Sequence, residues 1–490
     1  MKINSLKIEG FNVLDNDFFI DFNNSSNLSI LIGKNGSGKS SILEAVGLIF
    51  KSLYTGVNPP FKFVIDYELY EYKIGIQYND EDFTIRVNTT VYYLNDIDYL
   101  KNKGIKLLPD NIIAYYSGSN LRLKKVFNFG KYVQSPFLYV EDKHFKLILL
   151  TLLSSTFQSH KDFLNINFYV SNDNSFSFKL NIQLFSKKLI EQIMEIDENF
   201  IFYLKQGLNI QDLFEIIKQN ISNNTSDNKE MILDELYNIW QNVIANKVFE
   251  YSLNKSYKFR NNIFQFSFNY EELEYFMYKI GGEIDLFRNL LDLTSKGILT
   301  NVNFKFKKNS NFVDYTAFSE GERQLITVVG LKELISGESN LFLLDEPDTY
   351  LHPSWQNLLV NKFLEKQSNY TFVTTHSANI LKNISKKHIF ILKNINNKIQ
   401  VIEPPKSTFG RDVNSILNEA MGVDERNSEM DKLLDEYFTI ISERDFNNAN
   451  LKKEEILQLA LDHEEERFGY DEPELIRANA IIERMKVLGR

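Results

Sequence analysis

The sequence contains no cysteine among its 490 residues. Disulfide bonds, zinc sites built on thiolates and cysteine nucleophiles are therefore excluded together. Long apolar runs are also missing, because the most apolar segment, Leu147–Leu153, is too short to span a bilayer. The first 18 residues contain charges and asparagine where a signal peptide would have an apolar stretch. We therefore expect a soluble protein of the cytoplasm.

Positive charge is scarce, but only in one part of the chain. The formal net charge is −10, from 55 Lys and Arg against 65 Asp and Glu. Residues 411–490 contain 11 Lys and Arg against 20 Asp and Glu, so nearly all of the excess lies there. The rest is close to neutral, which argues against coating nucleic acid by bulk charge but allows a local DNA-facing surface. An acidic C-terminal segment is suited to docking a basic protein.

Residue patterns divide the chain into four parts. Residues 1–144 combine alternating strand patterns with a strand, a glycine-rich loop and a helix, whereas residues 145–300 have mostly helical spacing. Strand and helix patterns return in residues 301–403, and residues 404–490 form an acidic helical tail. With 40 Phe and 25 Tyr, the chain has enough apolar area for a large core. These patterns predict an α/β fold with a mixed sheet, antiparallel strands, a helical insertion and a helical tail.

The segment Gly33–Ser40 has the sequence GKNGSGKS, which fits the pattern G-x-x-x-x-G-K-[ST]. A buried strand pattern precedes it and a helical pattern follows it, as a phosphate-binding loop requires. Backbone N–H groups of such a loop surround phosphate oxygens, and the helix N-terminus adds partial positive charge. A glycine-rich turn without a ligand is the alternative, but it does not require these flanks. The expected nucleotide-binding residues are Gly33, Lys34, Asn35, Gly36, Ser37, Gly38, Lys39, Ser40 and Ser41.

Two acidic residues follow a second apolar strand pattern, Leu341–Leu344. Ligands bind at the carboxyl ends of strands in open α/β sheets, where Asp345 and Glu346 would lie. We expect Lys39 to contact the β- and γ-phosphates and Ser40 and Asp345 to hold Mg²⁺. Glu346 is expected to accept a proton from the attacking water. A solvated helix start would also explain the two acids, but the phosphate loop upstream favours catalysis.

Two further segments contain candidate functional residues. In Phe318–Gln324 (FSEGERQ), Ser319 and Glu322 fit a capping box at a helix start. Capping does not explain Gly321, which costs about 1 kcal/mol inside a helix unless a ligand approaches its backbone. His376 follows a short strand pattern, where it could sense a γ-phosphate or the attacking water. A histidine of this kind is more often structural when it occurs alone.

Together these segments resemble the motifs of the ABC-type ATPase superfamily. Gly33–Ser40 looks like Walker A, Phe318–Gln324 resembles the signature motif, and Leu341–Glu346 looks like Walker B with its catalytic glutamate. His376 resembles the switch histidine. The resemblance implies an ABC-type ATPase head, a P-loop NTPase that uses ATP and Mg²⁺.

The same resemblance implies a head-to-tail dimer. Each ATP would lie between the Lys39 loop of one subunit and Ser319, Gly321 and Glu322 of the other. Asp348 would lie in the loop that touches the opposite subunit. The glutamine that such ATPases usually supply near Mg²⁺ is not evident, since the strand at Ile112–Tyr116 is followed by SGS and the nearest upstream candidate is Gln77.

The residues after Asp345 distinguish subfamilies. Asp345–Pro353 (DEPDTYLHP) resembles the soluble ATPases of bacterial conflict and repair systems rather than transporter ATPases. The tail segments Thr408–Leu417 and Asp471–Ala478 resemble those of the Septu defence ATPases, the PtuA group, and of their retron-associated relatives. The gap between Ser40 and Ser319 contains no heptad repeat long enough for a chromosome-maintenance ATPase.

The Septu resemblance implies an anti-phage ATPase subunit that assembles with a separate HNH-type nuclease, a PtuB-like protein, and regulates it. The six histidines of the chain form no HxH or HNH-like cluster, so we expect no nuclease site of its own. The alternative is a RecF-like DNA-repair ATPase without a nuclease partner. A toxin–antitoxin or retron effector would have the same site chemistry, and a transporter subunit fits the motifs least well.

Three short basic segments leave nucleic acid open as a partner. They are NLRLKK (Arg122, Lys124, Lys125), NKSYKFR (Lys255, Lys258, Arg260) and FKFKK (Lys305, Lys307, Lys308). Solvated faces are the more ordinary interpretation of such segments. Local clustering of cations, rather than net charge, decides whether phosphates are contacted.

Overall fold

The computed structural model describes most of the chain, and two compact units are distinguished, Met1–Glu403 and Pro404–Arg490. The described residues are 1–14, 17–80, 82–93, 96–118, 122–127, 135–171, 176–206, 208, 210–223, 229–253, 255–335, 339–364, 369–396, 398–404, 408–410, 428–462 and 473–488. The tail segment 411–417 and residues Asp471 and Glu472, which carry part of the Septu resemblance, lie outside them.

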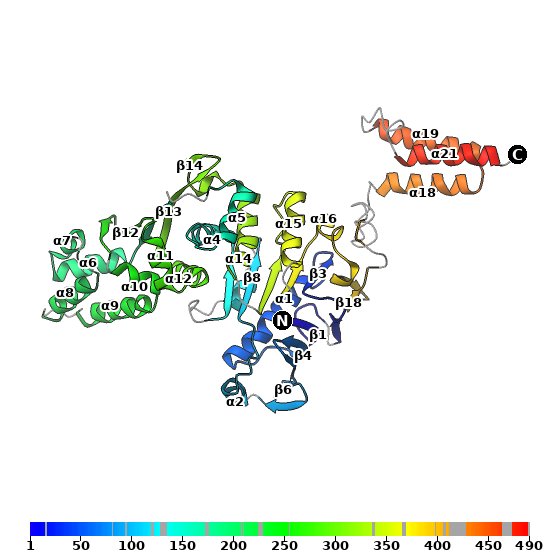
Figure 1. The fold of residues 1–490 in the computed structure, drawn as a ribbon. Coiled ribbons are helices and arrows are strands. Elements are labelled where there is room, and N and C mark those ends of the chain that lie inside the picture. Colours follow the sequence, from blue (N-terminus) through cyan, green and yellow to red (C-terminus); the bar gives the residue numbers. More distant parts are fainter. Residues whose placement is uncertain are drawn as a thin grey trace. The chain divides into compact units, whose positions relative to one another are not determined.

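A seven-stranded mixed sheet forms the centre of the first unit, with strand order β18-β17-β3-β16-β15-β8-β9 (Figure 1). Only the β17–β18 pair is antiparallel. Since the other pairs are parallel, the carboxyl ends of β3, β8, β15 and β16 meet at one edge. The strands are β3 (Leu28–Gly33), β8 (Asn111–Tyr116), β9 (Phe137–Val140), β15 (Asn340–Asp345), β16 (Tyr370–Thr374), β17 (Ile389–Ile395) and β18 (Lys398–Ile402).

A second, six-stranded sheet is fully antiparallel, with order β2-β1-β4-β5-β6-β7. Its alternating apolar residues share one core with helix α1 (Lys39–Thr55) and one face of the central sheet, as Ile65, Ile49 and Leu343 illustrate. The strands are β1 (Lys2–Glu9), β2 (Phe18–Asp21), β4 (Lys62–Leu69), β5 (Tyr72–Tyr78), β6 (Phe83–Val87) and β7 (Thr90–Tyr93). The predicted α/β fold with a mixed sheet and an antiparallel subdomain is therefore confirmed.

The other face of the central sheet is covered by helices. Phe342 of β15 packs edge-to-face against Phe363 of α15 (Pro353–Leu364), with ring centroids 5.3 Å apart. The helical segment after Ser319 consists of α13 (Glu320–Leu325), a buried π-helical segment (Ile326–Gly330) and α14 (Leu331–Leu334). The remaining helices around the sheets are α2 (Ile97–Asn102), α3 (Arg122–Phe127), α4 (Phe145–Leu153), α5 (Gln158–Phe168) and α16 (Ala378–Leu381).

The insertion contains more strand than its helical spacing predicts. A five-stranded antiparallel sheet, with order β11-β12-β10-β13-β14, crosses the predicted boundary at residue 300. Its strands are β10 (Ser177–Ile182), β11 (Tyr257–Arg260), β12 (Ile263–Phe268), β13 (Leu299–Lys308) and β14 (Asn311–Val313). The insertion helices are α6 (Lys187–Ile196), α7 (Phe200–Lys205), α8 (Ile210–Ser222), α9 (Lys229–Ile244), α10 (Lys247–Leu253), α11 (Leu273–Ile280) and α12 (Glu283–Ser295).

The described residues of the second unit form three helices, α18 (Ser428–Ser442), α19 (Phe446–Asp462) and α21 (Pro473–Leu488). They bury an apolar cluster of their own, which includes Tyr437 and Ile456. In the part of the chain that the structure describes, every helix is too short or too polar to cross a membrane.

Candidate functional site

The phosphate-binding loop has the predicted context, because β3 ends at Gly33 and α1 begins at Lys39. Glycine is required at both ends of the loop for reasons of space. A Cβ atom on Gly33 would lie 2.4 Å from the carbonyl oxygen of Leu392, and one on Gly38 would lie 2.9 Å from Cδ2 of Leu14. Gly38 also has a φ of 92°, which other residues rarely adopt. The loop is thus fixed against β17 and the segment after β1.

Polar groups of this loop point inward. Lys39 Nζ donates to the carbonyl oxygens of Gly33 (2.8 Å) and Lys34 (3.3 Å). Burial lowers the pKa of Lys39, and the nearby Glu346 and Asp345 carboxylates oppose this shift. The buried Ser37 hydroxyl has no hydrogen-bond partner among the described residues. A buried hydroxyl of this kind and a buried ammonium group fit a phosphate ligand.

Asp345 lies at the carboxyl end of β15, opposite Thr374 of β16 in the sheet. Its carboxylate accepts hydrogen bonds from the hydroxyl groups of Thr374 and Ser40. Burial raises the pKa of Asp345, and these two hydrogen bonds partly offset the shift. A hydroxyl and a carboxylate are hard oxygen ligands, and Mg²⁺ in nucleotide sites takes few protein ligands besides substrate phosphates. The pair Ser40 and Asp345 therefore fits Mg²⁺.

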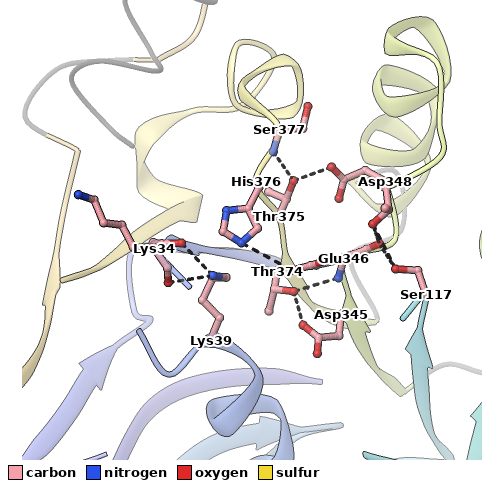
Figure 2. A network of polar contacts seen from close by, with 12 residues as sticks. Lys34, Lys39, Ser117, Asp345, Glu346, Asp348, Thr374, Thr375, His376 and Ser377 are labelled. Atoms are coloured by element: carbon pink, nitrogen blue, oxygen red, sulfur yellow. Dashed lines mark hydrogen bonds and ion pairs between the residues drawn. The ribbon is translucent and has the colours of Figure 1, made fainter. Parts of the chain in front are cut away.

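Glu346 has an unusual backbone, with a φ of 50°. This left-handed conformation is strained for a residue other than glycine, and it is held from both sides. The Glu346 N–H donates to the carbonyl oxygen (3.2 Å) and the hydroxyl (3.0 Å) of Thr374. The Glu346 carbonyl oxygen accepts from the hydroxyl groups of Ser117 (2.8 Å) and Thr349 (2.9 Å). Figure 2 shows this network around Glu346.

His376 lies beside Glu346, with 3.6 Å between Nε2 and Oε1. Burial lowers the pKa of His376, the charge of Lys39 lowers it further, and Glu346 opposes both effects. A neutral imidazole can exchange hydrogen bonds with a water molecule held by the glutamate. Lys39, Asp345, Glu346 and His376 thus gather at the carboxyl edge of the central sheet (Figure 2).

The structure also brings residues to this edge that the motifs do not include. Thr374 supports both acidic residues, and Ser117 follows β8 and contacts Glu346 and Thr349. Gln77, by contrast, is an exposed residue of β5 in the antiparallel sheet. The polar residue that follows β8 at the carboxyl edge of the central sheet is therefore Ser117. The alternation of buried and exposed residues in β5 could have excluded Gln77 from the site.

The predicted capping box at the start of α13 is confirmed. The Ser319 hydroxyl accepts from the Glu322 N–H (3.3 Å), and the Glu322 carboxylate accepts from the Ser319 N–H (2.7 Å). Glu322 also pairs with Lys308 of β13 at 2.7 Å, and this ion pair and the capping hydrogen bonds lower its pKa against the effect of burial. Within the described residues, the hydrogen bonds of Ser319 and Glu322 do not reach the phosphate loop of the same chain.

Gly321 has a packing role that the sequence does not reveal. A Cβ atom there would lie 3.0 Å from the Tyr350 carbonyl oxygen and 3.1 Å from the Trp355 ring. Contacts within the chain thus disfavour a larger residue at position 321. The neighbouring Gln324 is buried and bonds to the Pro347 carbonyl (2.8 Å) and the Tyr350 N–H (3.1 Å). Helix α13 is therefore hydrogen-bonded to the segment that follows Glu346.

Asp348 is buried in that segment. One carboxylate oxygen accepts from the Thr375 hydroxyl at 2.8 Å, and the other has no partner among the described residues. Burial raises the pKa of Asp348 to about 6. Asp348 thus connects the segment after β15 to the residue before His376.

One lysine of each basic segment is paired with a carboxylate of the chain. Lys124 pairs with Glu141, Lys255 with Glu272 and Lys308 with Glu322, each at 2.6 or 2.7 Å. Lys258 and Arg260 of the second segment are exposed.

Comparisons with known proteins find two retron ATPases with similar sequences. The chain is 23% identical over 434 residues to the "Retron Vc95 probable ATPase" of Vibrio cholerae serotype O1 biovar El Tor, a match covering 80% of this chain and 74% of that protein. It is 22% identical to the "Retron Ec83 probable ATPase" of Escherichia coli, over 99% of this chain and 87% of that protein.

Solved structures that match include SMC-type head domains. They are an Smc head bound to the C-terminal winged-helix domain of ScpA (13% identical, TM-score 0.34, covering 82% of this chain and 98% of that one) and the SMC head domain from Thermotoga maritima (12% identical, TM-score 0.32, covering 82% and 99%). At these TM-scores the likeness does not establish a common arrangement. The AAA ATPase domain family matches residues 1–381. Since that match spans most of the chain and contains all the motif residues at the sheet edge, the chain belongs to the AAA ATPase domain family.

Proposed function

We propose that the chain hydrolyses Mg-ATP as the ATPase subunit of an anti-phage defence complex, and that two copies form each active site. The gathering of Lys39, Asp345, Glu346 and His376 at one sheet edge is the observation that carries the proposal. The relatives named as retron ATPases support a defence setting.

Each residue at the carboxyl edge of the central sheet has its own role in hydrolysis. Lys39 binds the terminal phosphates, and its charge stabilises the negative charge that builds up as the γ-phosphoryl group transfers. Glu346 orients the attacking water and accepts its proton, and His376 contacts the same water from beside the carboxylate. Bound Mg²⁺ would supply charge neutralisation at the phosphates, with Ser40 and Asp345 as its protein ligands.

A second copy would complete the site. Ser319 and Glu322 bond to each other, and Glu322 also accepts from Lys308, while the Ser37 hydroxyl of the phosphate loop has no partner among the described residues. In a two-fold dimer the same surfaces meet twice, so each phosphate loop would face the α13 N-terminus of the other copy. The helix N-terminus and the Ser319 hydroxyl would then contact the γ-phosphate.

Replacing Ser319 by Asp tests this arrangement. Aspartate caps a helix as well as serine does, so α13 should keep its stability. A carboxylate facing the γ-phosphate should abolish ATP-dependent dimerisation and lower turnover by about 100-fold, since like charges close together repel strongly. ATP binding to the isolated phosphate loop should remain, as measured by calorimetry and by light scattering with and without ATP.

Ser319→Asn provides the matched control, because asparagine caps equally well without the charge. It should retain far more activity than the aspartate variant. Wild-type turnover in Ser319→Asp would contradict the two-copy site.

The acidic tail is the proposed docking site for a separate HNH-type nuclease subunit. Its helices form a compact unit with their own apolar cluster, so its removal should leave residues 1–403 folded. We expect a chain truncated after Glu403 to bind ATP with unchanged affinity and to lose co-purification with a co-expressed HNH-type nuclease. Retained co-purification at physiological salt would show that the nuclease binds elsewhere.

A further inference from the structure

Helices α10 and α11 of the insertion pack against each other (Figure 1). A groove of about 640 Å³ lies between them. We call it the insertion groove; its lining includes Lys247, Tyr251, Lys255, Tyr275 and Lys279. None of the residues assigned to ATP hydrolysis lines it. Its chemistry therefore requires an explanation of its own.

Two tyrosine rings provide aromatic faces in the groove. The Tyr251 ring of α10 lies nearly parallel to Phe268 of β12, with 6.2 Å between centroids and 26° between planes, so it is supported from behind. The Tyr275 ring of α11 lies 6.2 Å from Tyr251, and Tyr275 is 56% exposed. A supported ring beside an open one is suited to stacking a planar ligand.

Each helix combines a tyrosine with a lysine one turn away. Lys247 and Tyr251 are four residues apart on α10, and Tyr275 and Lys279 are four apart on α11, so each pair shares a helix face. Lys279 Nζ lies 5.3 Å from the centroid of the Tyr275 ring. A ligand stacked on Tyr275 would therefore place an attached phosphate near an ammonium group.

The acidic residues in the lining argue against a binding site for free phosphate. Glu272 holds Lys255 at 2.6 Å, and the hydrogen bond from Lys255 lowers the pKa of Glu272, so this carboxylate stays ionised. Glu250 and Ser256 add further polar atoms to the wall. Carboxylates would repel a free phosphate, but they accept hydrogen bonds from the amino groups of nucleobases. Aromatic faces, lysines and carboxylates together match a base with its phosphate.

A second exposed ring lies on the same helix as Tyr275. Tyr278 of α11 is 79% exposed and lies three residues from Tyr275, so the two rings are neighbours on the surface of the helix. A strand with several bases can stack on both rings, whereas a single nucleotide uses only one.

We propose that the insertion groove binds single-stranded nucleic acid, with one base stacked on Tyr275 and the adjoining phosphate near Lys279. The strand is recognised by stacking and charge, so sequence preference is modest and affinity falls as salt rises. The site is independent of ATP hydrolysis and of any nuclease partner.

Fluorescence anisotropy of the full-length protein with a labelled 20-nucleotide single strand tests the proposal. Replacing Tyr275 by Ala should weaken binding by about 5- to 100-fold, whereas Tyr275→Phe, which keeps the ring, should bind like the wild type. Lys279→Glu should weaken binding and reduce the salt dependence by about one ion. Lys187→Glu on the exposed face of α6 is the control and should have little effect. The ATPase rate without nucleic acid should be unchanged in all four variants.

Two competitors test which form of nucleic acid binds in the groove. A duplex of the same sequence and an unlabelled mononucleotide should each compete much less well than the single strand. Equal or better competition by the duplex would overturn the proposal, and so would a mononucleotide that competes as well as the strand. The proposal would also be overturned if the wild type bound no single strand. The same holds if Tyr275→Ala and Lys279→Glu bound the strand as tightly as the wild type. In either case the groove would be a surface for another class of partner.

Discussion

Replacing Glu346 by Gln is expected to lower the rate of ATP turnover by about 100- to 1,000-fold while ATP stays bound, since general-base catalysis contributes factors of this size. Glutamine has the same shape, and the hydrogen bonds that hold residue 346 use only its backbone N–H and carbonyl groups. The left-handed turn should therefore persist, and only proton acceptance is lost. Steady-state phosphate release and calorimetric titration with ATP measure the two effects separately.

The same variant should accumulate as an ATP-bound dimer, because the complex that awaits hydrolysis no longer decays. Glu191→Gln is a matched control, since Glu191 lies on α6 and its side chain is 63% exposed. That control should turn over ATP like the wild type. Turnover of Glu346→Gln within a few-fold of the wild type would show that another group accepts the proton.

Replacing Lys39 by Met is expected to raise the Kd for ATP by about 100-fold or more, because charge-assisted contacts to phosphate are among the strongest hydrogen bonds. The Lys39 ammonium group is buried in the unliganded loop, and burial already lowers its pKa. Methionine fills similar volume without a charge, so the variant should fold at least as stably. Calorimetry measures the affinity, and thermal unfolding without nucleotide checks the fold.

Lys34→Met is the matched control within the same loop. The Lys34 side chain is exposed and extends away from Lys39 (Figure 2), and only its carbonyl oxygen contacts the ammonium group. Its replacement should change the Kd for ATP by no more than a few-fold. An equal loss in both variants would mean that net charge, rather than the position of Lys39, governs binding.

The motif residues could be predicted from the sequence because each motif is defined by residues that are close together in the chain. Gly33–Ser40 needs only a strand before it and a helix after it, and both occur. The Ser319–Glu322 capping box is likewise set by residues three apart. Parallel strands then bring Asp345 and Thr374 to the same edge as the phosphate loop.

Other features depend on partners far apart in the chain and could not be predicted. Thr374 supports Asp345 and Glu346 only because β15 and β16 are paired in one register. The left-handed backbone at Glu346 needs Ser117, which lies 229 positions away. The insertion sheet could not be predicted, because helices separate β10 from β11 and β12 from β13, and β10 pairs with β13 across all of them.

The central claim, an ATP site shared between two copies, is tested most directly by mixing two inactive variants. Lys39→Met disables the phosphate loop and Ser319→Asp disables the α13 N-terminus, so neither should hydrolyse ATP alone. In a mixed dimer one site combines both defects, while the other combines an intact loop with an intact α13. Mixing equal amounts should then restore turnover to at most about one quarter of the wild-type rate, the value for random pairing, in which half of the dimers are mixed and each has one intact site. A mixture that stays as inactive as either variant alone would contradict the shared site.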